Sequence, residues 1–198
     1  KHTMGNVVKN FEILFAKKYK KKLGIMVNSG SSANLLMAES LKYHSKFNLK
    51  KGDEIIIPAL SWSTSYFPFH QAGYKIKLVD IDLQTLNIDL SKLSKAISKK
   101  TKAILAVNIL GNSNNFKEIY KIIKNKKIIL LEDNCESLHS KFNKKFTGTF
   151  GVMGTFSFFY SHHISTIEGG MILTDDIELS HILRVLRAHG WTRDIPEN

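Results

Sequence analysis

Three short polar segments of this 198-residue chain carry residue types that could do chemistry. The first, Asn28 to Asn34, follows an apolar run and begins an amphipathic one. Backbone N–H groups at the start of a helix attract phosphate, and the positive end of the helix dipole adds to that attraction. Gly30 would let a phosphate approach the backbone closely, and Ser31 could add a hydroxyl donor. An ordinary helix N-cap is the alternative, because serine is common before a helix.

The second segment, Glu132 to Glu136, places acidic residues at the end of a strongly apolar run. A carboxylate at the end of a buried strand is costly unless it is paired, bound to a ligand or located at the mouth of a site. Such a group could hold a metal ion, act as a base or pair with a protonated ring nitrogen, and helix capping is the alternative. We expect Cys135, the single cysteine, to be a small core residue.

The third segment, Phe156 to Gly170, reads as a strand that enters a polar turn with two histidines, His162 and His163, and ends at paired glycines. Adjacent histidines could bind a metal ion, transfer protons or be ordinary surface residues. Zinc sites usually use cysteine or histidines one helical turn apart, and neither pattern is present here. We therefore predict no metal site.

The elements that must position these segments alternate along the chain. Apolar runs without alternation, typical of parallel strands that are covered on both faces, span Gly24 to Asn28, Asp53 to Pro58, Lys75 to Ile81, Lys102 to Ile109 and Lys127 to Glu132, with two further strands at Gly154 to Phe159 and Gly170 to Thr174. Helices are expected at Ser31 to Tyr43, Trp62 to Gln71, Leu90 to Ile97, Asn115 to Lys124 and Ile177 to Ala188. Repeated strand–helix–strand units predict an α/β domain with a mostly parallel sheet, which binds ligands at the carboxyl ends of its strands.

Composition excludes several classes of protein. A hydrophobic content of 43% argues against a disordered chain, and no apolar run is long enough to span a membrane. The formal charge of +12 comes from 26 lysines and three arginines, and all the lysines lie at or before Lys145. The lysines stand singly or in short runs, so we interpret them as solvated faces and expect no nucleic-acid partner. A single cysteine fits a reducing compartment, and the cytoplasm is the expected location.

Together, the three segments resemble, in order and spacing, the DegT/DnrJ/EryC1/StrS family of vitamin B6-dependent sugar aminotransferases. The resemblance runs from Thr3 to Asn198. It implies a three-layer α/β fold with a mostly parallel sheet, the large domain of the type I pyridoxal phosphate (PLP) enzymes. Under this interpretation residues 1–198 form one PLP-binding domain, a fragment that lacks part of the N-terminal arm and the small C-terminal domain.

The resemblance also implies roles for individual residues. Gly30, Ser31 and Ser157 match the phosphate contacts of the family. Trp62 matches the aromatic residue that stacks on the cofactor ring, and a core aromatic is the alternative. Asp133 matches the carboxylate that keeps the pyridine nitrogen protonated, and Glu136 matches a residue near the 3-hydroxyl of the ring. The cofactor implied is PLP or its amine form, pyridoxamine 5′-phosphate (PMP).

One residue departs from the aminotransferase pattern. His162 stands where the aminotransferases have the lysine that forms a Schiff base with the cofactor, and no lysine follows Lys145 to replace it. Histidine cannot form that bond, but it can move protons near neutral pH. The same replacement is seen in the sugar 3-dehydratases of the family. The resemblance therefore implies removal of the C3 hydroxyl from a nucleotide-linked 4-keto-6-deoxyhexose, with L-glutamate restoring PMP.

Further expectations follow from the resemblance. A related dehydratase branch carries an iron–sulfur cluster, but one cysteine cannot hold it, so none is expected here. His189 and Arg193 match positions near the amino donor and the sugar nucleotide, Thr3 is a weaker candidate for the sugar site, and the family implies a homodimer. A true aminotransferase and a catalytically inactive dimerisation module are the alternatives. The intact set of cofactor residues argues against the inactive module.

Overall fold

A seven-stranded sheet forms the centre of the computed structural model, which describes residues 4–192. Its spatial order is β1-β9-β8-β5-β4-β2-β3. The strands are β1 (Leu23–Val27), β2 (Glu54–Pro58), β3 (Lys75–Val79), β4 (Thr101–Val107), β5 (Ile129–Asp133), β8 (Met153–Ser157) and β9 (Gly170–Thr174). Strands β8, β5, β4, β2 and β3 run parallel, whereas β9 is antiparallel to both of its neighbours. The carboxyl ends of β1, β2, β4, β5 and β8 therefore meet at one edge of the sheet.

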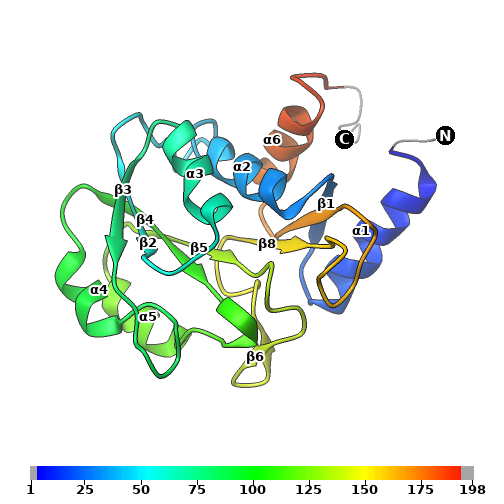
Figure 1. The fold of residues 1–198 in the computed structure, drawn as a ribbon. Helices are drawn as coiled ribbons and strands as arrows, with labels where there is room; N and C mark the ends of the chain where they lie inside the picture. Colours follow the sequence, from blue (N-terminus) through cyan, green and yellow to red (C-terminus); the bar gives the residue numbers. More distant parts are fainter. Residues whose placement is uncertain (1–3, 193–198) are drawn as a thin grey trace.

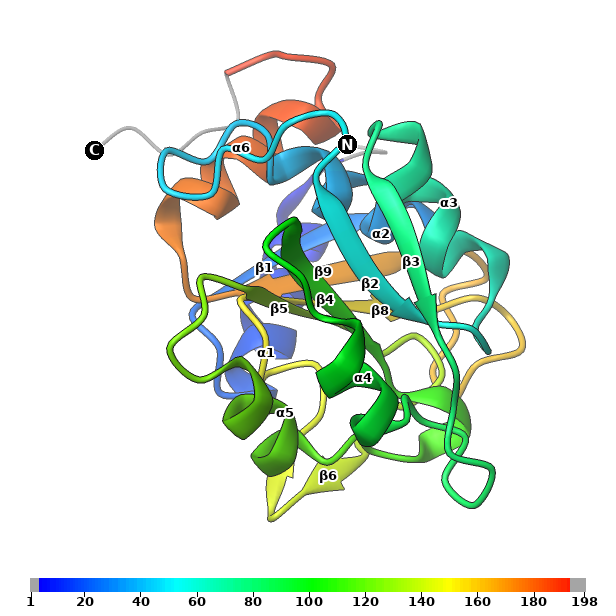
Figure 2. The ribbon, with the colours of Figure 1, turned by 90° about the vertical axis from the view of Figure 1, so that its left-hand side faces the viewer.

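Helices cover both faces of this sheet and produce three layers (Figures 1 and 2). One face carries α2 (Gly30–Ser40), α3 (Ser63–Gln71) and α6 (Ile177–Arg187), and the other carries α1 (Asn6–Lys18), α4 (Leu90–Ala96) and α5 (Phe116–Ile123). Alternate residues of each strand point to opposite faces. In β2, Ile55 and Ile57 join the core under α2 and α3, whereas Ile56 joins the core under α4 and α5. Burial on both faces explains why the strands read as continuous apolar runs.

The predicted elements are present, and their ends shift by a few residues. The sequence pattern missed helix α1, a short 3-10 helix at Ile109–Gly111 and the hairpin of β6 (Lys141–Phe142) and β7 (Lys145–Phe146). The apolar residues of α1 do not form a single stripe. Phe15 is buried against the sheet, but Val7 and Leu14 on the same helix are exposed. A one-sided pattern is the main sequence signal for a surface helix, and α1 lacks it.

None of the helices in the described part of the chain is both long and apolar enough to cross a membrane.

Candidate active site

The start of α2 lies at the carboxyl edge of the sheet, directly after β1. The hydroxyl of Ser29 accepts a hydrogen bond from the Ser32 N–H at 3.0 Å, and the Ser29 carbonyl accepts one from the Ala33 N–H. Ser29 is therefore the N-cap, as the alternative interpretation of this segment expected. The helical pattern leaves the N–H groups of Gly30 and Ser31 without an acceptor inside the helix. Capping and anion binding are thus compatible here, because different N–H groups serve each.

Gly30 allows the start of α2 to pack closely against two other segments. A Cβ atom at this position would lie 2.7 Å from Cβ of Ser157 and 2.8 Å from Sγ of Cys135. Any larger residue would push α2 away from the end of β8 and from the turn after β5. The glycine brings together Gly30 and Ser157, two residues expected to contact phosphate. Ser31 extends this group, because its hydroxyl donates to Oγ1 of Thr64 at the start of α3.

Asp133 ends β5 at the same edge and is 4% exposed. Its Oδ2 atom accepts hydrogen bonds from Nδ2 of Asn34 and from Oγ of Ser65, both at 2.8 Å. Its Oδ1 atom accepts one from the Cys135 N–H at 3.1 Å. The carboxylate therefore faces the starts of α2 and α3, and it does not cap a helix.

Glu132, the neighbouring acid, is fully buried on the opposite face of the sheet. It accepts hydrogen bonds from the N–H groups of Gly148, Phe150 and Gly151 and from Nδ2 of Asn108. Burial raises the pKa of Glu132, and these donors oppose that rise. The side chain links β5 to the segment that leads into β8, and it has no exposure to solvent.

His162 lies in the loop that joins β8 to β9. The loop is pinned at its base, where the Phe158 N–H donates to the Gly169 carbonyl and the Thr166 N–H donates to the Phe158 carbonyl. The imidazole meets the ring of Phe159 edge to face, with 6.1 Å between centroids. Its Nδ1 atom is buried and has no hydrogen-bond partner among the described residues. A buried polar atom without a hydrogen-bond partner is uncommon, and it indicates a place where a ligand or a water molecule binds.

The other predicted site residues are less closely grouped with Gly30 and Asp133. Trp62 is the N-cap residue of α3 and is 69% exposed, so the core-aromatic alternative is wrong. Glu136 accepts a hydrogen bond from the Leu110 N–H at 3.0 Å, which ties it to the turn after β4. His189 is exposed just beyond the end of α6. The predictions for Thr3 and Arg193 lie outside the described residues.

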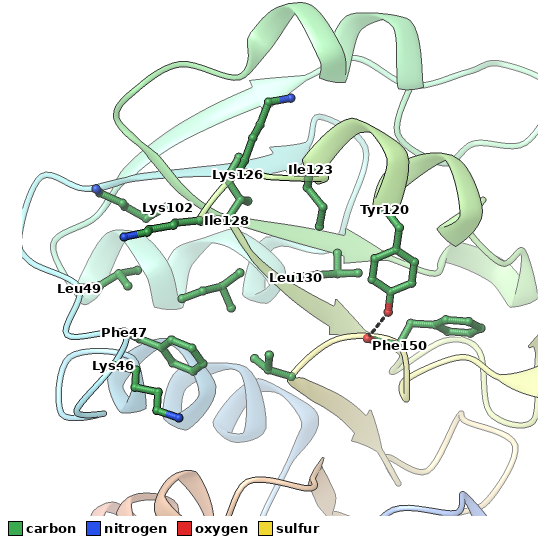
Figure 3. Close-up of a pocket in the computed structure, with 13 residues that line it drawn as sticks. Lys46, Phe47, Leu49, Lys102, Tyr120, Ile123, Lys126, Ile128, Leu130 and Phe150 are labelled. Carbon is green, nitrogen blue, oxygen red and sulfur yellow. Dashed lines mark hydrogen bonds between the residues drawn. The ribbon is translucent and has the colours of Figure 1, made fainter.

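A cavity of about 580 Å³ opens at the opposite, amino-terminal edge of the sheet (Figure 3). Its floor is apolar, and Lys46, Lys102, Lys126 and Lys127 are among the residues that line it. The Tyr120 hydroxyl donates to the Phe150 carbonyl at 2.6 Å beside it. Ligands of parallel α/β sheets bind at the carboxyl ends of the strands, so this cavity is separate from the candidate active site.

Three residues around Asp133 were missed by the sequence analysis. Asn34, Ser65 and Thr155 are each at most 1% exposed, and they form a connected polar group with Asp133. The sequence does carry a weak signal. Asn34 follows Gly30 by four residues and therefore lies on the same face of α2. The partner of that face could not be read from the sequence.

A profile of the DegT/DnrJ/EryC1/StrS aminotransferase family matches residues 1–197 of the chain. The chain belongs to this family. Among curated members, GDP-4-keto-6-deoxy-D-mannose 3-dehydratase of Escherichia coli is 60% identical over 195 residues, which are 98% of this chain and 50% of the relative. The enzyme of the same name from Yersinia pseudotuberculosis is 58% identical over the same shares. The chain therefore spans about half the length of the curated relatives it matches.

Solved structures of the family agree with the fold. The Escherichia coli GDP-4-keto-6-deoxy-D-mannose-3-dehydratase with bound hydrated PLP superposes with a TM-score of 0.97 at 60% identity, covering 99% of this chain and 50% of that one. Helicobacter pylori PseC, an aminotransferase, superposes with a TM-score of 0.89 at 29% identity, covering 98% and 52%. The predicted fold class is confirmed: the mostly parallel sheet and its helices match the fold of PLP-dependent aminotransferases.

Proposed function

We propose that the protein carrying this chain is a PLP- and PMP-dependent sugar-nucleotide 3-dehydratase. It would remove the C3 hydroxyl of a nucleotide-linked 4-keto-6-deoxyhexose, and L-glutamate would regenerate PMP. The observation that carries the proposal is the histidine at position 162, in a chain that is 60% identical to a 3-dehydratase over 98% of its length. The whole enzyme is about twice as long in the curated relatives, so the activity is proposed for the intact protein.

Solved relatives support a role for this histidine. One structure of GDP-4-keto-6-deoxymannose-3-dehydratase has a histidine replaced by asparagine and holds GDP-perosamine. Another has an adjacent serine and histidine replaced by asparagine and lysine. A third holds a trapped adduct of PLP and glutamate. This chain carries an adjacent serine and histidine, Ser161 and His162, in the loop after β8.

The residues at the carboxyl edge fit the cofactor. The close packing at Gly30 sets the Ser157 side chain beside the start of α2, where backbone N–H groups favour an anion, and this supports a phosphate site. Asp133 retains acceptor capacity for a protonated ring nitrogen. The buried Nδ1 atom of His162 has no hydrogen-bond partner among the described residues, so it is available to a ligand. These three features lie on different elements, and they would serve different parts of the cofactor: the phosphate, the ring nitrogen and the carbon that loses a proton.

When bound, PMP supplies an amine that condenses with the sugar ketone and a ring that accepts electrons. The protein residues would do the rest. Gly30, Ser31 and Ser157 would hold the phosphate, Trp62 would stack on the ring, and Glu136 would lie near the 3-hydroxyl. Asp133 would keep the ring nitrogen protonated.

His162 would act as the proton carrier. It would remove a proton from the C4′ carbon of the cofactor and return it to the C3 oxygen of the sugar, so that the hydroxyl leaves as water. Because His162 cannot form a covalent bond of the lysine type, cofactor retention would depend on the phosphate, stacking and Asp133 contacts.

The remaining expectations concern partners. We propose His189, Arg193 and Thr3 as weaker candidates for contacts with the nucleotide sugar and the amino donor, because the family pattern places them there. A homodimer in the cytoplasm is the assembly and location that the family resemblance implies.

The decisive experiment uses the intact protein with PMP, L-glutamate and GDP-4-keto-6-deoxy-D-mannose, with the product identified by mass. A 3-deoxy ketone released with ammonia is the expected result, and a 4-amino sugar would establish the aminotransferase instead. We expect His162→Asn to abolish dehydration while PMP binding, measured by equilibrium dialysis, is unchanged. His163→Asn is the matched control, because the neighbouring histidine is assigned no role. Normal turnover by His162→Asn would refute the proton-carrier role.

A further inference from the structure

Asp133 is surrounded by a buried polar group that no part of the mechanism above uses. Asn34 on α2, Ser65 on α3 and Thr155 on β8 are each at most 1% exposed. Asn34 and Ser65 both donate to one oxygen of Asp133, the Oδ2 atom, at 2.8 Å. Two helices therefore contribute one donor each to the same carboxylate oxygen.

Counting acceptor sites shows what this arrangement leaves open. An ionised carboxylate has about four lone-pair sites, two on each oxygen. Asn34 and Ser65 occupy both sites on Oδ2, and the Cys135 N–H occupies one on Oδ1. Counting the N–H and O–H donors of the described residues, one acceptor site remains, on Oδ1, and the Cys135 thiol is a further, weaker donor beside Asp133. The next donor to reach Asp133 must therefore bind Oδ1.

The groups around Asn34 fix the orientation of its amide. The Thr155 hydroxyl lies 2.7 Å from Oδ1 of Asn34 and donates to it. The two N–H bonds of the amide are then directed to Oδ2 of Asp133 and to the Thr64 carbonyl, the latter at 3.0 Å. A flipped amide would set its oxygen against the Asp133 carboxylate and the Thr64 carbonyl, which are both acceptors. The amide is therefore held as a donor toward Asp133.

We propose that Asn34 and Ser65 are positioning residues that hold the Asp133 carboxylate in place and direct its Oδ1 atom toward the cofactor ring nitrogen. The hydrogen bonds from Asn34 and Ser65 to Oδ2 are charge-assisted, so they are strong enough to define the position of this oxygen. Because the two donors to Oδ2 come from two different helices, they also fix the rotation of the carboxyl group. The assignment rests on the proposed function, because it requires a cofactor with a ring nitrogen.

A pair of ligands isolates this effect from general damage to the site. PMP and its 1-deaza analogue, in which a carbon replaces the ring nitrogen, share the phosphate, the ring and the amine. The amine forms avoid Schiff bases with the many surface lysines. Dissociation constants of both ligands for the intact protein, measured by equilibrium dialysis, give a preference for PMP that reports the Asp133 contact alone.

We expect the unsubstituted protein to prefer PMP and Ser65→Ala to reduce that preference about tenfold, the usual effect of losing a hydrogen bond to a charged group. Asn34→Asp keeps the shape of the side chain but places a second carboxylate beside Asp133, so it should reduce the preference at least as much. Ser40→Ala is the matched control. Ser40 is equally buried on α2, and its hydroxyl bonds the Met37 carbonyl rather than Asp133.

Other outcomes would contradict either the positioning role of Asn34 and Ser65 or the proposed function. An unchanged or increased preference in Ser65→Ala, or an equal loss of affinity for both ligands, overturns the positioning role and leaves the proposed function intact. Failure of the unsubstituted protein to bind PMP would overturn the proposed function, and the positioning role with it.

Discussion

Glu132 and Asp133 are neighbours on β5, and their side chains enter opposite faces of the sheet with contrasting surroundings. Glu132 meets four N–H donors, three from the backbone of residues 148–151 and one from Asn108. Asp133 meets three donors, and two of them converge on a single oxygen. Both side chains are buried, so exposure does not distinguish the two acids.

The difference lies in acceptor capacity. The four donors to Glu132 occupy all the sites that a carboxylate offers, whereas the donors to Asp133 leave one site open. A saturated buried carboxylate holds segments of the chain together. One with a remaining acceptor site can receive a ligand. The difference supports a structural role for Glu132 and the cofactor role proposed for Asp133, and substitutions at each residue test that division.

The largest effect is expected for turnover when Asp133 is replaced. Asp133→Asn retains an oxygen for the donors from Asn34 and Ser65 but removes the charge that would keep the ring nitrogen protonated. Dehydration by the intact protein should fall by roughly a hundredfold or more. The free energy of unfolding should change by no more than about 1 kcal/mol. Initial rates with saturating PMP and a urea titration measure the two quantities.

The corresponding substitution at the neighbouring acid is the control for this experiment. If Glu132→Gln, in the fraction that folds, reduced turnover as much as Asp133→Asn, the two acids would share a role and the comparison would fail.

The sequence supplied the alternation of strands and helices because period and composition are local properties. Continuous apolar runs such as Ile55 to Ile57 require burial on both faces, and that requirement alone predicts a sheet between two layers of helices. The antiparallel strand β9 could not be predicted in the same way. Its apolar run reads like that of a parallel strand, and its direction depends on pairing with β1 and β8.

Residues of the candidate site could be predicted only where they lie in a motif of the family. Gly30 and Ser157 are far apart in the sequence, and the structure brings them together as the resemblance implied. The sequence could not separate Glu132 from Asp133, because both are acids at the end of one apolar run. Their roles depend on donors supplied from residues 34, 65 and 148–151. Such long-range contacts leave no periodic signal.

A smaller effect, on stability, is expected for Glu132. Glu132→Gln replaces one acceptor oxygen with an amide that points its own N–H bonds at backbone donors. Two buried donors lose their acceptor, so the free energy of unfolding at neutral pH should fall by about 3 kcal/mol. Urea titration followed by circular dichroism measures the change. Glu136→Gln is the matched control, since its single bond to Leu110 is on an exposed turn. Equal stability of Glu132→Gln and the unsubstituted protein would contradict the structural role.

The smallest effect concerns the pH dependence of that difference. Because burial raises the pKa of Glu132 above the ordinary value of 4.5, the folded protein binds more protons at this site than the unfolded chain between the two values. Stability contributed by the side chain is then fully present below pH 4.5 and decreases as pH rises through the folded pKa. The stability advantage over Glu132→Gln should follow this course in urea titrations at a series of pH values. An advantage that grows with pH would mean that the four N–H donors lower the pKa of Glu132 by more than burial raises it.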